Sequence, residues 1–140
     1  MAAEDEIRQA SEQFYEALNR VVNGDPQLMT EIWSHDSDVA TMHPIGGRQV
    51  GWEQVQDSWE QVAQALSDGQ VSLNDMVISP IADDVAYTLG TEQGEAKFGG
   101  ESVGIDWRAT NIYRREADGW KIVLHHTDVS PEMVETFSRL

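Results

Sequence analysis

Apolar residues recur at helical spacing in two stretches of the chain. Between residues 4 and 22 they fall every third or fourth position, which predicts an amphipathic helix. That pattern ends at Asn23-Gly24-Asp25-Pro26, and Pro26 suits the first turn of a short second helix over residues 27–33. A third helix is predicted over residues 52–66, before Ser67-Asp68-Gly69 breaks the pattern.

Beyond Gly69 the hydrophobic period changes to two, which is typical of strands. Four long alternating runs lie near residues 71–81, 85–98, 104–116 and 120–129, separated by hairpin-like turns. Residues 39–42 form a shorter apolar run before the third helix, and Pro131 opens a short terminal helix. Three helices followed by four consecutive strands predict an α+β fold, with a curved antiparallel sheet packed over the helices.

The charge of the chain excludes one class of function. Its 140 residues suit a single domain over residues 1–140, with 25 acidic residues, nine basic ones and a net charge of −16. Nucleic-acid binding depends on basic residues that neutralise phosphates, so we expect no nucleic-acid partner. The acidic surface fits either a protein from a salty cytoplasm or an ordinary acidic bacterial protein.

Several further classes of site lack their sequence signals. No apolar stretch is long enough to span a membrane, and the N-terminus lacks the features of a secretory signal, so we expect no membrane partner and a cytoplasmic location. The chain has no cysteine. Phosphate-binding and dinucleotide motifs are absent, and no histidine has metal-ligand spacing, so we expect neither cofactor nor metal.

Two sequence motifs connect the chain with a known family. They are the turn His43-Pro44-Ile45-Gly46 and the closing stretch from Asn111 through Gly119-Trp120 to Asp128. With the predicted order of elements, they resemble the SnoaL-like branch of the nuclear transport factor 2 (NTF2) superfamily. The resemblance implies a cone-shaped, cystatin-like fold around a pocket, with dimerisation through the sheet. This superfamily includes ketosteroid isomerases, polyketide cyclases, dehydratases and the calcium/calmodulin-dependent kinase II association domain.

The resemblance also indicates two candidate catalytic residues. Ketosteroid isomerases carry Asp-Pro-Val-Gly where this chain has His43-Pro44-Ile45-Gly46, so His43 occupies the position of the general base. Imidazole has an ordinary pKa near 6.5, which suits proton transfer at neutral pH. Asn111 falls on the acid of the isomerase oxyanion hole and can donate a hydrogen bond. The isomerase tyrosine of helix one falls on Ala17, two residues from Tyr15.

Strand alternation decides which side chains enter the pocket. We expect Asn111 to face inward with Trp107, Ala109 and Tyr113, whereas a one-residue bulge would bring Arg108 and Thr110 inward instead. Near the end of the last strand, His125 and His126 must point to opposite faces, so one of them can line the pocket. Asp128 shares the face of His126, where it either pairs with that histidine or caps the following turn.

Aromatic residues on the helices and the second long strand are predicted to form much of the pocket wall. The complete set of expected ligand-binding residues is Tyr15, Trp33, Trp52, Trp59, Tyr87, Leu89, Trp107, His125, His126 and Asp128.

These residues lead to one expected function and one alternative. The first is proton transfer on a small, mostly apolar molecule bearing a carbonyl or hydroxyl, giving isomerisation, cyclisation or dehydration. In it, His43 removes the proton and Asn111 stabilises the oxyanion. The alternative is a ligand-binding or assembly module without chemistry, similar to the kinase association domain. Either way we expect a homodimer that binds a small apolar molecule.

Overall fold

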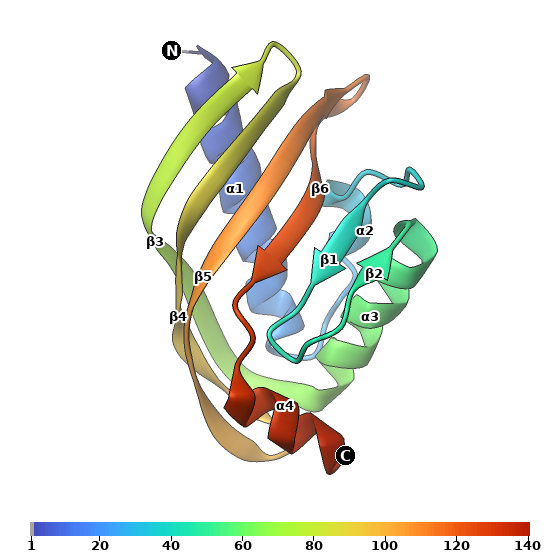
Figure 1. Cartoon of the computed structure of the whole chain (residues 1–140), viewed down its shortest axis with the longest axis vertical. Helices are drawn as coiled ribbons and strands as arrows, with labels where there is room; N and C mark the ends of the chain where they lie inside the picture. The colour runs from blue at the N-terminus through green and yellow to red at the C-terminus, as the bar shows by residue number, and fades with distance from the viewer. Residues whose placement is uncertain (1) are drawn as a thin grey trace.

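A computed structural model describes residues 2–140 of the chain, and Figure 1 shows its arrangement. Helix α1 (Ala2–Val21) crosses the concave side of a curved sheet, with α2 (Met29–Ile32) and α3 (Trp52–Ala65) beside it. The apolar stripe of α1 explains this placement, because Ile7, Phe14 and Val21 are fully buried. None of the helices in residues 2–140 is long and apolar enough to cross a membrane.

The sheet has six strands in the order β2-β1-β6-β5-β4-β3. The strands are β1 (Ala40–Met42), β2 (Gln49–Val50), β3 (Leu66–Ala82), β4 (Val85–Phe98), β5 (Glu101–Glu116) and β6 (Gly119–Thr127). The four long strands form the predicted antiparallel meander. However, β1 runs parallel to β6, so the sheet is mixed and the prediction of a purely antiparallel sheet is wrong.

Two local predictions also differ from the structure. The second helix covers only Met29–Ile32, because Trp33 is already extended and bridges to Ile122 of β6. Strand β3 begins at Leu66, before the predicted break at residues 67–69. Pairing of Leu66 with Phe98 in β4 holds this segment in the sheet, and a register shift accommodates its turn-forming residues.

The predicted terminal helix is present as α4 (Pro131–Ser138), with Pro131 at its first turn. The side chain of Ser130 accepts a hydrogen bond from the Met133 backbone and caps the helix. Helix α4 lies where the bent ends of β3, β4 and β5 meet the end of α3 (Figure 1). The ring of Phe137 stacks on Phe98 with centroids 6.1 Å apart, which fixes α4 against the sheet.

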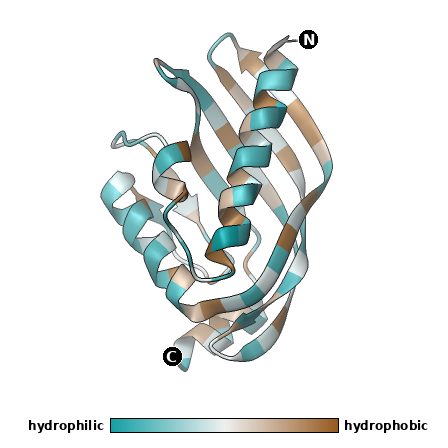
Figure 2. Cartoon of the chain, turned by 180° about the vertical axis from the view of Figure 1, so that it is seen from behind, coloured by the Kyte–Doolittle hydropathy of each residue, from teal (hydrophilic) through white to brown (hydrophobic). Residues whose placement is uncertain are grey.

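The core lies between the concave face of the sheet and the helices. Seen from behind, α1 crosses strands that carry many apolar segments, while the side of α1 turned to the viewer is mostly polar (Figure 2). The indole of Trp59 from α3 packs edge-on to Phe14 of α1 and to His43, which follows β1. Because these rings hold α1, α3 and β1 together, the imidazole of His43 is set firmly inside the cone.

Candidate functional site

A narrow, mostly apolar cavity lies inside the cone and extends to α4. It offers about 50 Å³ to water, which is several times the roughly 10–15 Å³ that a cavity needs to hold a single water molecule. Its walls comprise Leu18, Val22, His43, Pro44, Ile45, Trp59, Val62, Leu66, Val71, Glu92, Ala96, Val103, Ile105, Trp107, His125 and Met133. No lysine or arginine is among them, and three of these side chains can titrate: His43, Glu92 and His125.

His43 borders this cavity, as predicted from the sequence, directly after β1 and before Pro44. Its Nε2 lies 2.9 Å from Ser58 Oγ, and Ser58 donates its own proton to the Val55 carbonyl at 2.7 Å. Since a serine hydroxyl has one proton, His43 Nε2 must be the donor in the first contact, which leaves the ring lone pair on Nδ1. Burial lowers the pKa of His43 to about 4, so the ring is neutral at pH 7.

The predicted alternation along β5 is confirmed. Trp107, Asn111 and Tyr113 are buried on the concave side, whereas Arg108 is exposed and Thr110 is half-buried on the opposite side. No register shift interrupts the pairing of β5 with β4. The alternative parity, in which Arg108 and Thr110 enter the cavity, is therefore wrong.

A chain of buried hydrogen bonds runs behind the cavity wall. Asn111 Nδ2 donates to the Tyr15 hydroxyl at 3.0 Å, and Asn111 Oδ1 lies 2.7 Å from His125 Nδ1. Both ends of the Asn111 amide are thus occupied, and neither Asn111 nor Tyr15 borders the cavity. Asn111 orients His125 and Tyr15 instead of presenting a free donor to a ligand.

Tyr15 lies where the resemblance had predicted no tyrosine. Counting from the resemblance reached Ala17 and left no tyrosine beside Asn111. In the structure the hydroxyl of Tyr15 contacts Asn111 and donates to Glu92 Oε2 at 2.8 Å. The length of the tyrosine side chain allows this contact, and the position of the Cα along the helix does not reveal it.

Glu92 is the main residue of the site that the sequence patterns did not indicate. It lies in mid-β4, is only 2% exposed, and accepts hydrogen bonds from Tyr15 and from Trp107 Nε1, the latter at 2.8 Å. Burial raises the pKa of its carboxyl to about 7. Glu92 has an even residue number in β4, as have the buried Ala96 and Phe98, and side chains alternate along a strand. This alternation could have predicted that Glu92 faces the inside of the protein.

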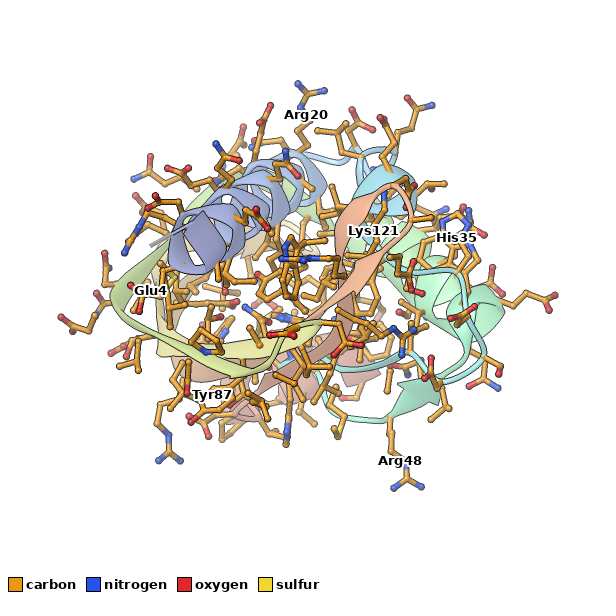
Figure 3. All side chains as sticks on the ribbon, turned by 90° about the horizontal axis from the view of Figure 1, so that it is seen from above. Glu4, Arg20, His35, Arg48, Tyr87 and Lys121 are labelled. Carbon is orange, nitrogen blue, oxygen red and sulfur yellow. The ribbon has the colours of Figure 1, made fainter. Side chains whose placement is uncertain are left out.

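Four expected ligand-binding residues lie on the outer face of the sheet, away from the cavity. Leu89 is 40% exposed and Tyr87 is half-buried, since the inward positions of β4 are taken by Ala86 and Thr88. Figure 3 shows Tyr87 on the side of the sheet opposite α1. His126 is also exposed there, on the opposite face of β6 from His125.

Asp128, the fourth of these residues, binds Arg108, which was not among its expected partners. Its carboxylate receives hydrogen bonds from the Arg108 guanidinium at 2.9 and 3.0 Å, and a third from the Arg108 backbone. Arg108 holds the pKa of Asp128 below its usual range. Asp128 therefore contacts Arg108 in place of His126 or the backbone of the following turn, and the terminal helix that starts there is capped by Ser130.

Of the expected aromatic wall, Trp59 and Trp107 border the cavity, as does the imidazole of His125. Trp33 is buried beneath α2 and α3 and does not reach the cavity, and Trp52 stacks on His35 with ring centroids 4.3 Å apart. Residues 2–140 contain no group of three or more His, Asp or Glu side chains arranged to hold a metal ion. The site can therefore be described as two imidazoles and one carboxyl in an apolar cavity.

Comparisons with known proteins agree with this architecture. The chain is similar to a candidate dehydratase of the NTF2-like family from Streptomyces avermitilis, with 28% identity, a TM-score of 0.77, and coverage of 90% of this chain and 94% of that one. It is also similar to a candidate calcium/calmodulin-dependent protein kinase type II association domain from Thiobacillus denitrificans, with 28% identity, a TM-score of 0.69, and coverage of 86% and 92%.

A third comparison bears on the fold alone. An NTF2-like superfamily protein from Salmonella enterica has a TM-score of 0.79 at 17% identity, with 91% of each chain covered. None of the curated proteins compared with the chain matches it. The model of the SnoaL-like domain matches residues 7–130, which include every residue of the cavity wall except Met133. The chain therefore belongs to the SnoaL-like family, and its curved mixed sheet with helices is the NTF2-like, cystatin-like fold.

Proposed function

We propose that this protein catalyses proton transfer on a small, neutral molecule that bears a carbonyl or hydroxyl, with His43 as the base. The observation that carries this proposal is the state of His43. Its ring is buried, neutral and oriented by Ser58, its lone pair is on Nδ1, and the residue borders an apolar cavity. A fixed, unprotonated imidazole in such surroundings is suited to removing a proton from carbon.

The walls of the cavity indicate the kind of molecule that fits. A carboxylate or phosphate would enter this apolar space without a cationic partner, so an anionic ligand is disfavoured. The space is also too small for a sterol, because ligand pockets for drug-sized molecules occupy roughly 300–1,000 Å³. A neutral compound with only a few heavy atoms matches both constraints. Asn111 contributes by positioning His125 and Tyr15.

Replacing His43 with glutamine should abolish this activity. We expect wild-type protein to accelerate exchange of the α-hydrogens of acetone, butanone or 4-hydroxy-2-butanone with D2O, followed by proton NMR. The variant should lose on the order of 100-fold or more in exchange rate, because glutamine cannot accept the proton. His35→Gln is the matched control, since His35 is exposed and does not border the cavity, and it should exchange at the wild-type rate.

The alternative function makes the opposite prediction. The similarity to a candidate kinase association domain favours a binding or assembly module, in which the cavity holds a ligand without chemistry. Such a module would raise its melting temperature with a ligand and show no exchange with any of the three ketones. That result would replace the catalytic proposal with the binding one.

We also propose that the protein forms a homodimer through the outer face of the sheet. In a chain with 25 acidic residues, the middle of this face carries none on the central strands. Its members are Tyr87, Leu89, Thr110, Ile112, Leu124 and His126. A second copy of the same chain fits here because the uncharged face avoids the repulsion that two acidic surfaces would create.

Sedimentation equilibrium tests this dimer. We expect a mass of twice the 15.7 kDa chain for wild type, and a monomer for Leu89→Glu, which places a charge at the centre of the face. Gln61→Glu adds the same charge on the outer side of α3 and should leave the dimer intact. A wild-type monomer at micromolar concentration would contradict the proposal.

A further inference from the structure

The carboxyl of Glu92 borders the same cavity as His43, and proton removal by His43 does not use it. Both of its oxygens have donors, because Oε2 accepts from Tyr15 at 2.8 Å and Oε1 accepts from Trp107 at 2.8 Å. A carboxyl held by two donors deep in an apolar site is costly to maintain. Its fixed position and contact with the cavity suit it to act on a bound molecule.

The hydrogen-bond chain around Glu92 has a definite direction. Tyr15 uses its only hydroxyl proton on Glu92, so the Tyr15 oxygen can only accept from Asn111 Nδ2. That orientation turns Asn111 Oδ1 toward His125 Nδ1. Because an amide oxygen can only accept, His125 Nδ1 must be protonated and donate to it. His125 is therefore left with its lone pair on Nε2.

This lone pair faces Glu92 across a gap. His125 Nε2 and Glu92 Oε2 are 3.9 Å apart, which is too far for a hydrogen bond but leaves both atoms available to a group beside them. A hydroxyl is a small neutral group that can both donate to His125 Nε2 and, through its oxygen, accept from Glu92. A carbonyl oxygen or an ether oxygen can satisfy Glu92 only.

The charges around Glu92 favour its neutral acid form. The titratable groups that face it are Tyr15 from α1, Tyr113 from β5, His125 from β6 and His43 after β1, and none of them is a cation at neutral pH. The facing part of β3 contributes Leu73, which pairs with Glu92 in register. Burial lowers the pKa of His125, so the proton resides on Glu92 rather than on the imidazole.

We propose that the cavity binds a neutral β-hydroxy carbonyl compound with its hydroxyl between Glu92 and His125, and that Glu92 protonates this hydroxyl so that it leaves as water. This proposal rests on the proposed function of His43. His43 Nδ1 takes the proton from the carbon next to the carbonyl, and that C–H electron pair forms the new C=C bond. The C–O bond breaks, and its electron pair takes the proton of Glu92.

The products balance as an α,β-unsaturated carbonyl compound, water, a protonated His43 and an ionised Glu92. Transfer of one proton from His43 to Glu92 through the released water restores the starting state, and no oxidant or cofactor enters the reaction. The centroids of the His43 and His125 rings are 6.3 Å apart. This separation places the base and the hydroxyl-binding pair at neighbouring points of one small molecule.

The reaction of 4-hydroxy-2-butanone tests the role of Glu92, because exchange and dehydration can be followed in the same sample. We expect Glu92→Gln to dehydrate this ketone at least about 100-fold more slowly than wild type while keeping α-hydrogen exchange within about threefold. Glu95→Gln is the matched control, since Glu95 is exposed on the outer face of the same strand, and it should retain both activities.

The outcomes separate the two proposals. Loss of exchange and dehydration in His43→Gln, with loss of dehydration alone in Glu92→Gln, supports both. Dehydration by Glu92→Gln within tenfold of wild type overturns the role of Glu92 and leaves that of His43 intact. Equal loss of both activities in a Glu92→Gln protein also overturns it, because Glu92 would then serve the whole site rather than the leaving hydroxyl.

A binding measurement on wild type keeps the proposal testable if Glu92→Gln fails to fold. The methyl ether 4-methoxy-2-butanone can accept from Glu92 but cannot donate to His125. We expect calorimetry to show the alcohol binding at least about tenfold more tightly than the ether, because the ether leaves the His125 lone pair without a partner. Equal affinities would overturn the hydroxyl site.

Discussion

Replacing Gly94 with alanine should destabilise the protein by about 3–5 kcal/mol, one of the largest effects expected from a single methyl group. Gly94 lies in β4 with φ at +156°, and a Cβ at this position would be 2.0 Å from the carbonyl oxygen of Gln70 in β3. The obstacle is backbone, so no side-chain rotation relieves it. The β3–β4 pairing must open near Glu92 to make room.

Gly104→Ala is the matched control for this variant. Gly104 lies in the next strand, pairs with Glu95, and has no atom within 4 Å of the position of an added Cβ. We expect urea unfolding to show a change within about 0.5 kcal/mol for Gly104→Ala and the large loss for Gly94→Ala. Similar stabilities for the two variants would contradict the close approach of β3 and β4.

Periodicity predicted much of this fold because most of its elements have one clear apolar face. Helix α1 has a single buried stripe, and β5 alternates between buried and exposed positions over most of its length. The start of β3 could not be predicted in this way, since residues 67–69 are typical of a turn. Their place in the sheet depends on the pairing of Leu66 with Phe98 and of Ser67 with Lys97, about 30 residues later.

The prediction of which β4 side chains face the core was wrong for a different reason. Its larger apolar residues, Tyr87 and Leu89, point outward, whereas small Ala86 and Thr88 face the crowded inside. When both faces of a strand carry apolar groups, alternation does not say which face is the core. The same ambiguity concealed Glu92, because an acidic residue in a strand is ordinarily assigned to the solvent side.

His43 could be identified from the turn that contains it, but its partners could not. The contact with Ser58 joins residues 15 positions apart, and the bond between Asn111 and Tyr15 joins residues 96 apart. Such contacts depend on how α1 and α3 pack across the sheet. Strand parity correctly placed Asn111 inside, yet only the packing shows that its amide is fully used by Tyr15 and His125.

The second large effect is the pH dependence of dehydration. Activity needs His43 without its proton and Glu92 with its proton. The pKa of His43 is lowered to about 4, so the base is ready above that pH, and the pKa of Glu92 is raised to about 7, so the acid is ready below that pH. As the pH increases, we therefore expect kcat/KM to rise about tenfold per pH unit until pH 4 is reached. Above pH 7 it should fall about tenfold for each further unit.

The most direct test of the account is the pH profile of wild-type protein acting on 4-hydroxy-2-butanone, with dehydration and α-hydrogen exchange measured together. Dehydration should fall by about 50-fold between pH 7 and pH 9 as Glu92 ionises, while exchange, which needs only neutral His43, should stay nearly constant. A dehydration rate that holds or rises up to about pH 9 would contradict an acid at Glu92 working with a base at His43.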